Sequence, residues 1–283
     1  MLGLLGWFLA LVLGLAAVRL AVASGQGILA HPVLRRENYR GRGVATAAGL
    51  LVVVAVLFAA AGRSVAGALG PGSDEGLDGA QTLMLVAVLG YAFLGFVDDL
   101  LGGDDARGFR GHVGAALRGR LTTGFVKLAG GGALAIVLVA TPGFASGRRL
   151  VVDAVLIALA ANVGNLLDRA PGRVGKVGLV VYGPLALALG AGDVGLALAV
   201  VMGAFLGLLR DDLHERIMLG DTGANALGAA LGLAVVLGCG SGVRLAVMLV
   251  LLALNLAAEV VSFSRVIEAI PPLRAFDRLG RRP

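Results

Sequence analysis

The sequence predicts an all-α membrane protein, a bundle of about nine transmembrane helices that forms a single domain over residues 1–283. Of the 283 residues, 58% are hydrophobic and only 15% are charged, and the mean hydropathy is +0.92. Soluble domains carry about 25% charged residues, so this composition excludes a soluble protein. It also excludes intrinsic disorder, which requires low hydrophobicity. The apolar runs are continuous rather than alternating, which excludes a transmembrane β-barrel.

Nine apolar segments approach the length of about 20 residues that a helix needs to cross a bilayer. They are residues 2–23, 44–62, 80–97, 124–140, 150–168, 177–192, 194–209, 223–239 and 242–263. The sixth and seventh are short and share the break Gly190-Ala191-Gly192-Asp193. No basic segment precedes the first helix, so we expect a retained anchor rather than a cleaved signal peptide. The 46 glycines indicate close packing between these helices.

The charge of the loops predicts the orientation of the bundle. The segments that share a side with the C-terminus (24–43, 98–123, 169–176, 210–222 and the tail) hold 18 Lys and Arg residues, and the opposite loops hold 4. Because basic loops stay in the cytoplasm, we expect the N-terminus outside and the C-terminus inside, in a multi-pass plasma-membrane protein. At least nine carboxylates fall on the basic side as well, and topology alone does not explain them.

The first candidate motif is Gly95-Phe96-Val97-Asp98-Asp99, at the basic end of the third predicted helix. Two adjacent carboxylates at a membrane boundary repel each other and are costly to desolvate. A divalent cation relieves that cost, and Mg²⁺ prefers one or two carboxylates together with phosphate oxygens. The alternative is a solvated helix end with no ligand.

The second motif lies at the basic end of the fifth predicted helix. Asn162, Asn165 and Asp168 recur every three residues, which places them on one face of a helix. A polar stripe that ends in a carboxylate favours a binding site, although amides inside a membrane also hold helices together.

The third motif, Gly220-Asp221-Thr222-Gly223, opens the eighth predicted helix. The N–H groups of a helix start favour phosphate, and an aspartate there can hold a metal ion. The alternative is an ordinary N-cap made by Asp221 or Thr222. Lys127, one turn inside the fourth helix, is either a snorkelling lysine or a phosphate ligand.

Together, and in this order, the three motifs resemble the polyprenyl-phosphate N-acetylhexosamine-1-phosphate transferases of the glycosyltransferase family 4 type. That superfamily includes phospho-N-acetylmuramoyl-pentapeptide transferase and the GlcNAc-1-phosphate transferases. Phe96-Val97-Asp98-Asp99 resembles the family's aspartate pair, Asn165-Leu166-Leu167-Asp168 its Asn-Leu-Thr-Asp segment, and Gly220-Asp221-Thr222-Gly223 its Gly-Asp-Thr-Gly-Ser. The stretch 40–49 is similar to its Pro-x-x-Gly-Gly loop, and 271–274 stands where the family has Pro-Leu-His-His-His.

The resemblance implies an enzyme of cell-wall biogenesis that transfers a sugar-1-phosphate, of the N-acetylhexosamine type, from a UDP-sugar to polyprenyl phosphate and releases UMP. Mg²⁺ is the implied cofactor, with Mn²⁺ as the alternative. Asp98, Asp99 and Asp221 are the implied catalytic residues: Asp98 engages the lipid phosphate, and Asp99 and Asp221 hold the metal. The implied substrate-binding residues are Asn162, Asn165, Asp168, Lys127, Arg40, Arg42, Met218 and Arg274. We expect no nucleic-acid partner, and a homodimer is a further expectation.

This sequence departs from the family pattern chiefly on the donor side. Pro171 stands where the family often has a second aspartate, and Met218 replaces an aromatic residue that would stack on a base. Arg274 and its neighbours replace the histidine triplet, and the 40–49 loop lacks the proline and one glycine. These departures predict altered donor recognition and argue against pentapeptide donors. Two alternatives stay open: a non-catalytic paralogue that binds polyprenyl phosphate or acts as a scaffold, and a lipid or solute transporter.

Overall fold

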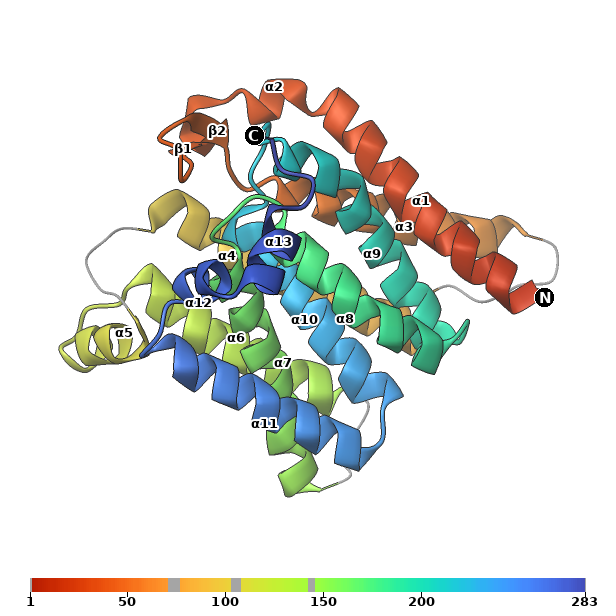
Figure 1. The fold of residues 1–283 in the computed structure, drawn as a ribbon. Coiled ribbons are helices and arrows are strands. Elements are labelled where there is room, and N and C mark those ends of the chain that lie inside the picture. Colours follow the sequence, from red (N-terminus) through yellow and green to blue (C-terminus); the bar gives the residue numbers. More distant parts are fainter. Residues whose placement is uncertain (1, 71–76, 103–107, 142–145, 283) are drawn as a thin grey trace.

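The structure is a computed structural model that describes residues 2–70, 77–102, 108–141 and 146–282 (Figure 1). Within those residues, eight helices are long and apolar enough to cross a membrane. They are α1 (Leu2–Ser24), α3 (Gly49–Leu69), α4 (Gly79–Leu101), α6 (Thr123–Ala140), α7 (Gly147–Leu167), α9 (Asp193–Leu213), α10 (Gly220–Gly238) and α11 (Ser241–Ala258). The sixth predicted span is α8 (Arg173–Leu189), which has 17 residues. The all-α polytopic bundle predicted from the sequence is therefore confirmed.

Shorter elements complete the described chain. They are α2 (Gln26–Leu29), the 3₁₀ helix η1 (Pro32–Leu34), β1 (Arg35–Glu37), β2 (Gly43–Ala45), α5 (Gly108–Leu117), α12 (Phe263–Ala269) and α13 (Pro271–Arg278). Strands β1 and β2 form an antiparallel hairpin in which Arg35 lies opposite Ala45. The expected break between the sixth and seventh segments is present, because α8 ends at Leu189 and α9 begins at Asp193.

Two predicted helices differ most from the structure. The second predicted helix, 44–62, is α3 at Gly49–Leu69 because residues 43–45 pair with β1 instead of joining the helix. The ninth, 242–263, ends at Ala258, and the chain turns before α12 begins at Phe263. In these two cases a hairpin or a turn overrides the apolar run.

Helix α10 is the centre of the bundle. Inside the bundle, 89% of its apolar stretch is buried, against 17% for α1 and 11% for α11, which lie on opposite sides of it in Figure 1. The outer helices present large apolar side chains outward, among them Phe8 and Leu249. Such faces are normal where lipid replaces water as the solvent, and they leave the small residues for the helix contacts.

Glycines bring three helices to backbone distance around the start of α10. A Cβ atom at Gly95 of α4 would overlap the carbonyl group of Asp221, and one at Gly164 of α7 would overlap that of Ala224. Gly49 of α3 is packed just as closely on Gly223. Because glycine lacks a side chain, α3, α4 and α7 all converge where the third sequence motif lies. This convergence brings the polar ends of α4, α7 and α10 together.

Candidate active site

Lys127 joins two of the predicted catalytic carboxylates. Its Nζ atom lies 2.8 Å from Asp98 Oδ2 at the end of α4, and it also forms an ion pair with Asp221 Oδ2 at the start of α10. The side chains of all three residues remain between 20% and 27% exposed, so the cluster is open to ligands. Because an unpaired charge at this depth is costly, the lysine ammonium stabilises the pair by offsetting one of its two negative charges.

Asp99 points to the start of α10. Its Oδ1 accepts a hydrogen bond from the backbone N–H of Asp221 at 3.1 Å. Its Oδ2 accepts one from the N–H of Thr222 at 2.9 Å and one from the hydroxyl of Thr222 at 2.6 Å. The first N–H groups of a helix have no partner within the helix, so Asp99 acts as a cap supplied by a neighbouring helix.

The backbone at Gly220 allows this close approach. Gly220 has a φ of 72°, a conformation that residues with a side chain rarely adopt. A Cβ atom there would lie 2.6 Å from Asp99 Oδ2 and 2.8 Å from the backbone nitrogen of Ala47. The first glycine of the third motif is therefore required by space as well as by backbone conformation.

The β1–β2 hairpin is tied to the same site. The N–H of Met218 donates to the carbonyl of Ala45 at 2.7 Å, and the N–H of Ala48 donates to the carbonyl of Met218 at 3.1 Å. Arg36 at the base of the hairpin donates through Nη2 to the carbonyls of Asp99 and Leu100, both at 3.1 Å. These bonds cap the C-terminal end of α4, where carbonyl groups lack partners within the helix.

Asp168 ends α7 next to this cluster. Its partial burial, together with the negative charges of Asp212, Asp221 and Asp99, raises the pKa of the Asp168 carboxyl well above its usual value. One turn earlier, the buried Nδ2 atom of Asn165 has no hydrogen-bond partner among the described residues. A buried amide donor without a partner is costly, so its position invites a ligand acceptor.

The C-terminal segment is clamped onto the loop that follows Asp168. Arg173 at the start of α8 forms a bidentate pair with Asp277, with Nε–Oδ1 at 2.8 Å and Nη2–Oδ2 at 2.9 Å. Lys176 donates to the carbonyls of Phe276, Asp277 and Leu279. Figure 1 shows this segment returning to the end of the bundle that holds the hairpin. The clamp fixes the loop that positions Asp168.

Several residues predicted to bind substrate have their described partners elsewhere. Asn162 donates to Asn255 of α11 at 2.5 Å, a contact that joins two helices. Arg40 pairs with Glu215 at 3.2 Å, and Arg274 pairs with Glu268 at 3.9 Å. Arg42 is exposed, and its backbone N–H closes the hairpin turn. Their roles in substrate binding stay predictions.

The oxygens of the carboxylates are of the kind that a divalent cation prefers. Among the described residues, no group of three or more His, Cys, Asp or Glu side chains is placed to hold a metal. However, one oxygen of Asp98 and one of Asp221 converge on a single positive charge, the Lys127 ammonium. Mg²⁺ commonly takes one or two protein carboxylates and completes its shell with water and phosphate oxygens, so two convergent oxygens match its preference.

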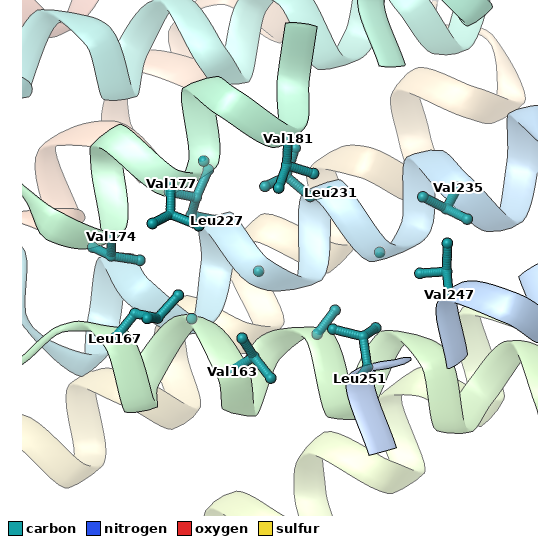
Figure 2. Close-up of a pocket in the computed structure, with 15 residues that line it drawn as sticks. Val163, Leu167, Val174, Val177, Val181, Leu227, Leu231, Val235, Val247 and Leu251 are labelled. Atoms are coloured by element: carbon teal, nitrogen blue, oxygen red, sulfur yellow. The ribbon is translucent and has the colours of Figure 1, made fainter. Parts of the chain in front are cut away.

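An apolar pocket of about 110 Å³ opens between α7, α8, α10 and α11 (Figure 2). Figure 2 shows Val163, Val177, Leu227, Leu231 and Leu251 around it, and its lining also includes Leu167 and Val174. Leu167 immediately precedes Asp168, so this end of the pocket lies next to the polar cluster.

The sequence model of glycosyl transferase family 4 matches residues 81–239, which is more than half of the chain and includes α4, α6, α7 and α10. The chain belongs to glycosyl transferase family 4. The matched segment contains Asp98, Asp99, Lys127, Asp168 and Asp221, so the family region holds the cluster that the structure brings together.

The chain is also similar to three proteins named phospho-N-acetylmuramoyl-pentapeptide-transferase. The one from Shouchella clausii is 26% identical over 206 residues, which cover 69% of this chain and 61% of that protein. The one from Oceanobacillus iheyensis is 25% identical over 296 aligned positions, covering 88% and 84%. The one from Moorella thermoacetica is 31% identical over 159 residues, covering 52% and 50%. The matches of this glycosyl transferase family 4 chain thus cover between 50% and 84% of the length of these three relatives.

Sequence reasoning missed three contributors to the site. Thr222 was considered as a cap, but it donates its hydroxyl to Asp99 instead. Arg36 was counted only as a loop charge, although it binds the end of α4. Asp212 is one of the carboxylates on the basic side, and its Oδ2 accepts the N–H of Gly172 at 3.0 Å, which holds the loop after Asp168. Arg36 and Asp212 lie outside the three motifs, and the partners of all three residues are distant in sequence.

Proposed function

We propose that the chain transfers a sugar-1-phosphate from a UDP-sugar to a polyprenyl phosphate. In this reaction an oxygen of the lipid phosphate attacks the phosphorus atom that carries the sugar. The bond from that phosphorus to the oxygen bridging to UMP breaks, and UMP leaves with the bonding electrons. The products are polyprenyl-diphospho-sugar and UMP. The observation that carries this proposal is the convergence of Asp98 and Asp221 on Lys127, beside the start of α10.

The main task of such a site is to bring two anions together. A phosphate monoester has a second pKa of about 6 and is largely dianionic at neutral pH, so the acceptor needs no strong base. Phosphoryl transfer depends mainly on positioning and on charge neutralisation. We assign Asp98 and Asp221 to a shared Mg²⁺, which would neutralise charge on the phosphates when bound. Asp98 would also face the lipid phosphate, and Lys127 would contact phosphate oxygens once the carboxylates bind the cation.

Asp99 has a different task in this proposal. Both of its oxygens accept hydrogen bonds from the first residues of α10, so it acts as a positioning residue for Asp221. Its carboxylate adds to the negative charge of the site without a direct bond to the metal. The sequence resemblance grouped Asp99 with the metal region, and the geometry favours Asp98 as the second carboxylate.

The nucleotide and the lipid would bind in two different regions beside the carboxylate cluster. Asn165, with its buried amide donor, and Asp168 would lie on the nucleotide side, with half-buried Met218 near the base. The apolar pocket next to Leu167 suits the first part of a polyprenyl chain, because its lining is made of aliphatic side chains and glycines. We place the site on the cytoplasmic face, in agreement with the basic loops at this end of the bundle.

The test is an assay of the purified full chain with Mg²⁺, a polyprenyl phosphate and a panel of UDP-sugars. We expect UMP and a polyprenyl-diphospho-sugar to appear together in equal amounts, and both to disappear with EDTA. The departures on the donor side predict that a donor without a pentapeptide is the substrate. Polyprenyl-phosphate binding without UMP release from any donor would favour the non-catalytic paralogue instead.

A further inference from the structure

A second cavity, of about 430 Å³, lies at the same end of the bundle but outside the candidate active site. It is enclosed by the end of α1, by α2, by β2 and by the end of α9, and we call it the arginine cavity. Its charged lining residues are Arg19, Arg35, Arg216, Asp211 and Glu215. The isolated parallel β-bridge between Ala45 and Ile217 forms part of its wall.

Asp211 holds two of these arginines in place. Its Oδ2 accepts from Nη1 of Arg19, and its Oδ1 accepts from Nη1 of Arg216 at 3.0 Å. The carboxylate is 7% exposed, whereas the two arginine side chains are 46% and 51% exposed. Each guanidinium carries five N–H donors and uses only Nη1 in these bonds. Nη1 of Arg19 also donates to the carbonyl of Gly207 at 3.1 Å. One buried carboxylate therefore fixes two cations whose side chains remain about half exposed.

The balance of charge in the arginine cavity favours an anion. The second acid, Glu215, accepts from Asn38 Nδ2 at 2.7 Å and pairs with Arg40 outside the lining. Arg35 is exposed, and no described residue accepts a hydrogen bond from its side chain. The lining thus carries three arginines against two acids, of which Asp211 pairs with Arg19 and Arg216 and Glu215 pairs with Arg40. Guanidinium groups bind phosphate oxygens in pairs and suit phosphate better than a point charge does.

The depth of the cavity and its surroundings indicate a lipid. Arg19 precedes the end of α1 by five residues, or about 7.5 Å at 1.5 Å per residue, so its long side chain can extend to the headgroup region if α1 spans the bilayer. Exposed apolar side chains flank it, with Leu20 at 69% and Ile28 at 63% exposure. Val22 and Leu29 add apolar lining beneath the charges. A ligand here would have an anionic head and apolar chains.

We propose that the arginine cavity binds the phosphate group of an anionic phospholipid of the surrounding bilayer. Basic pockets between transmembrane helices recognise lipid headgroups by this combination of charge and depth. The site is independent of the transferase proposal, since it shares no lining residue with the carboxylate cluster. A bound lipid would stabilise the position of the β1–β2 hairpin, because Ala45 of β2 lines the cavity. The carbonyl of Ala45 also accepts the N–H of Met218, which connects the hairpin to the start of α10.

The experiment is thermal unfolding of the full chain in neutral detergent micelles, with phosphatidylglycerol or phosphatidylcholine added at matched amounts. We expect phosphatidylglycerol to raise the midpoint temperature by several degrees more than phosphatidylcholine, and added salt to reduce the difference. The double variant Arg35→Gln/Arg216→Gln should lose most of this difference. Arg265→Gln, an exposed arginine of α12 outside the cavity, is the matched control and should keep it.

The single variant Arg35→Gln distinguishes a loss of lipid binding from a folding defect, because the Arg35 side chain donates no hydrogen bond to a described residue. It should unfold like the wild type in phosphatidylcholine and still lose part of the phosphatidylglycerol effect. Equal stabilisation by the two lipids, or an equal loss in Arg265→Gln, would overturn the site. Equal stabilisation by inorganic phosphate at the same phosphate concentration and ionic strength would overturn the assignment to a lipid.

Discussion

Asp99 at the end of α4 accepts both the backbone N–H and the hydroxyl of Thr222 at the start of α10, at 2.9 Å and 2.6 Å. The two residues are 123 positions apart, and their contact joins the first and third sequence motifs. Because Asp221 lies between the glycine turn and Thr222, this contact fixes the direction in which the Asp221 carboxylate points. The bond is thus part of the fold and also sets up the site.

Replacement of Thr222 by valine tests this contact, because it removes the hydroxyl and keeps the shape. Hydrogen bonds to charged groups are worth about 1.5–3 kcal/mol, and we expect a loss of that order in the free energy of unfolding. Thermal or denaturant unfolding in detergent micelles measures it. Thr82→Val is the control, since the Thr82 hydroxyl bonds a carbonyl in the first turn of α4 at the opposite end, in an exposed position. Equal losses in the two variants would contradict the special role of Thr222.

Replacement of Lys127 by methionine should change the response to divalent cations. Without the ammonium, Asp98 and Asp221 repel each other, so the variant should unfold at a lower temperature than the wild type in EDTA. Mg²⁺ should then restore more stability to the variant than it adds to the wild type, because it no longer competes with a lysine for the same oxygens. A Mg²⁺ titration of the unfolding midpoint measures both effects. An unchanged Mg²⁺ response would contradict the shared carboxylate site.

Asp168→Asn should stabilise the protein in a pH-dependent way. The pKa of Asp168 is raised in the folded state by its burial and by the charges of Asp212, Asp221 and Asp99. Protonation therefore contributes stability that is fully present below the unfolded pKa of about 3.9 and is lost as the pH rises through the folded pKa. At about pH 8, without divalent cations, the variant should unfold a few degrees above the wild type.

The same variant should bind the donor less well, because we propose that Asp168 lies on the nucleotide side. Unfolding midpoints from acid to alkaline pH show whether the gap between Asp168→Asn and wild type closes in acid, as the sign of the shift requires. A gap that widens in acid would mean that the carboxylate is stabilised, rather than strained, by its surroundings.

A large side chain at the rim of the apolar pocket tests whether the polyprenyl chain binds there. Val181 lines the pocket and is 42% exposed, so a tryptophan there can enter the pocket at little cost to folding. Displacing about two methylene groups of the lipid, at about 0.8 kcal/mol each, should raise the KM for polyprenyl phosphate roughly tenfold. The KM for the UDP-sugar should not change. Val180→Trp, at the next residue and outside the pocket lining, is the control and should leave both constants unaltered.

Hydropathy predicts this fold well because each span must bury an apolar surface in lipid. The break at 190–193 is predicted for the same reason, since glycines and a charge interrupt the run. The start of α3 is not predictable locally, because Val44 and Ala45 are apolar and only their pairing with β1 removes them from the helix. The orientation of the termini stays a prediction that rests on the loop charges.

The site is predicted less completely than the fold. Motif chemistry identifies Asp98, Asp221 and Lys127 as candidates, but their contacts span 29 and 94 residues and require the packed bundle. Arg36 and Asp212 escape notice because a single arginine or aspartate in a charged loop is ordinary. Arg40 and Arg274 were predicted from their place in family-like loops, and the structure gives each an acidic partner there.

The most direct test of the central claim is UMP release by the wild type, Asp221→Asn and Asp193→Asn, measured side by side with Mg²⁺, polyprenyl phosphate and the best UDP-sugar. Asp193 lies at the exposed start of α9, at the other end of the helix from the site, and serves as the matched control. Loss of an electrostatic group at a reacting phosphate costs about 10²–10³ in rate, so Asp221→Asn should fall by that factor while Asp193→Asn stays at the wild-type rate. Full activity in Asp221→Asn, or no UMP from the wild type with any donor, would contradict the account.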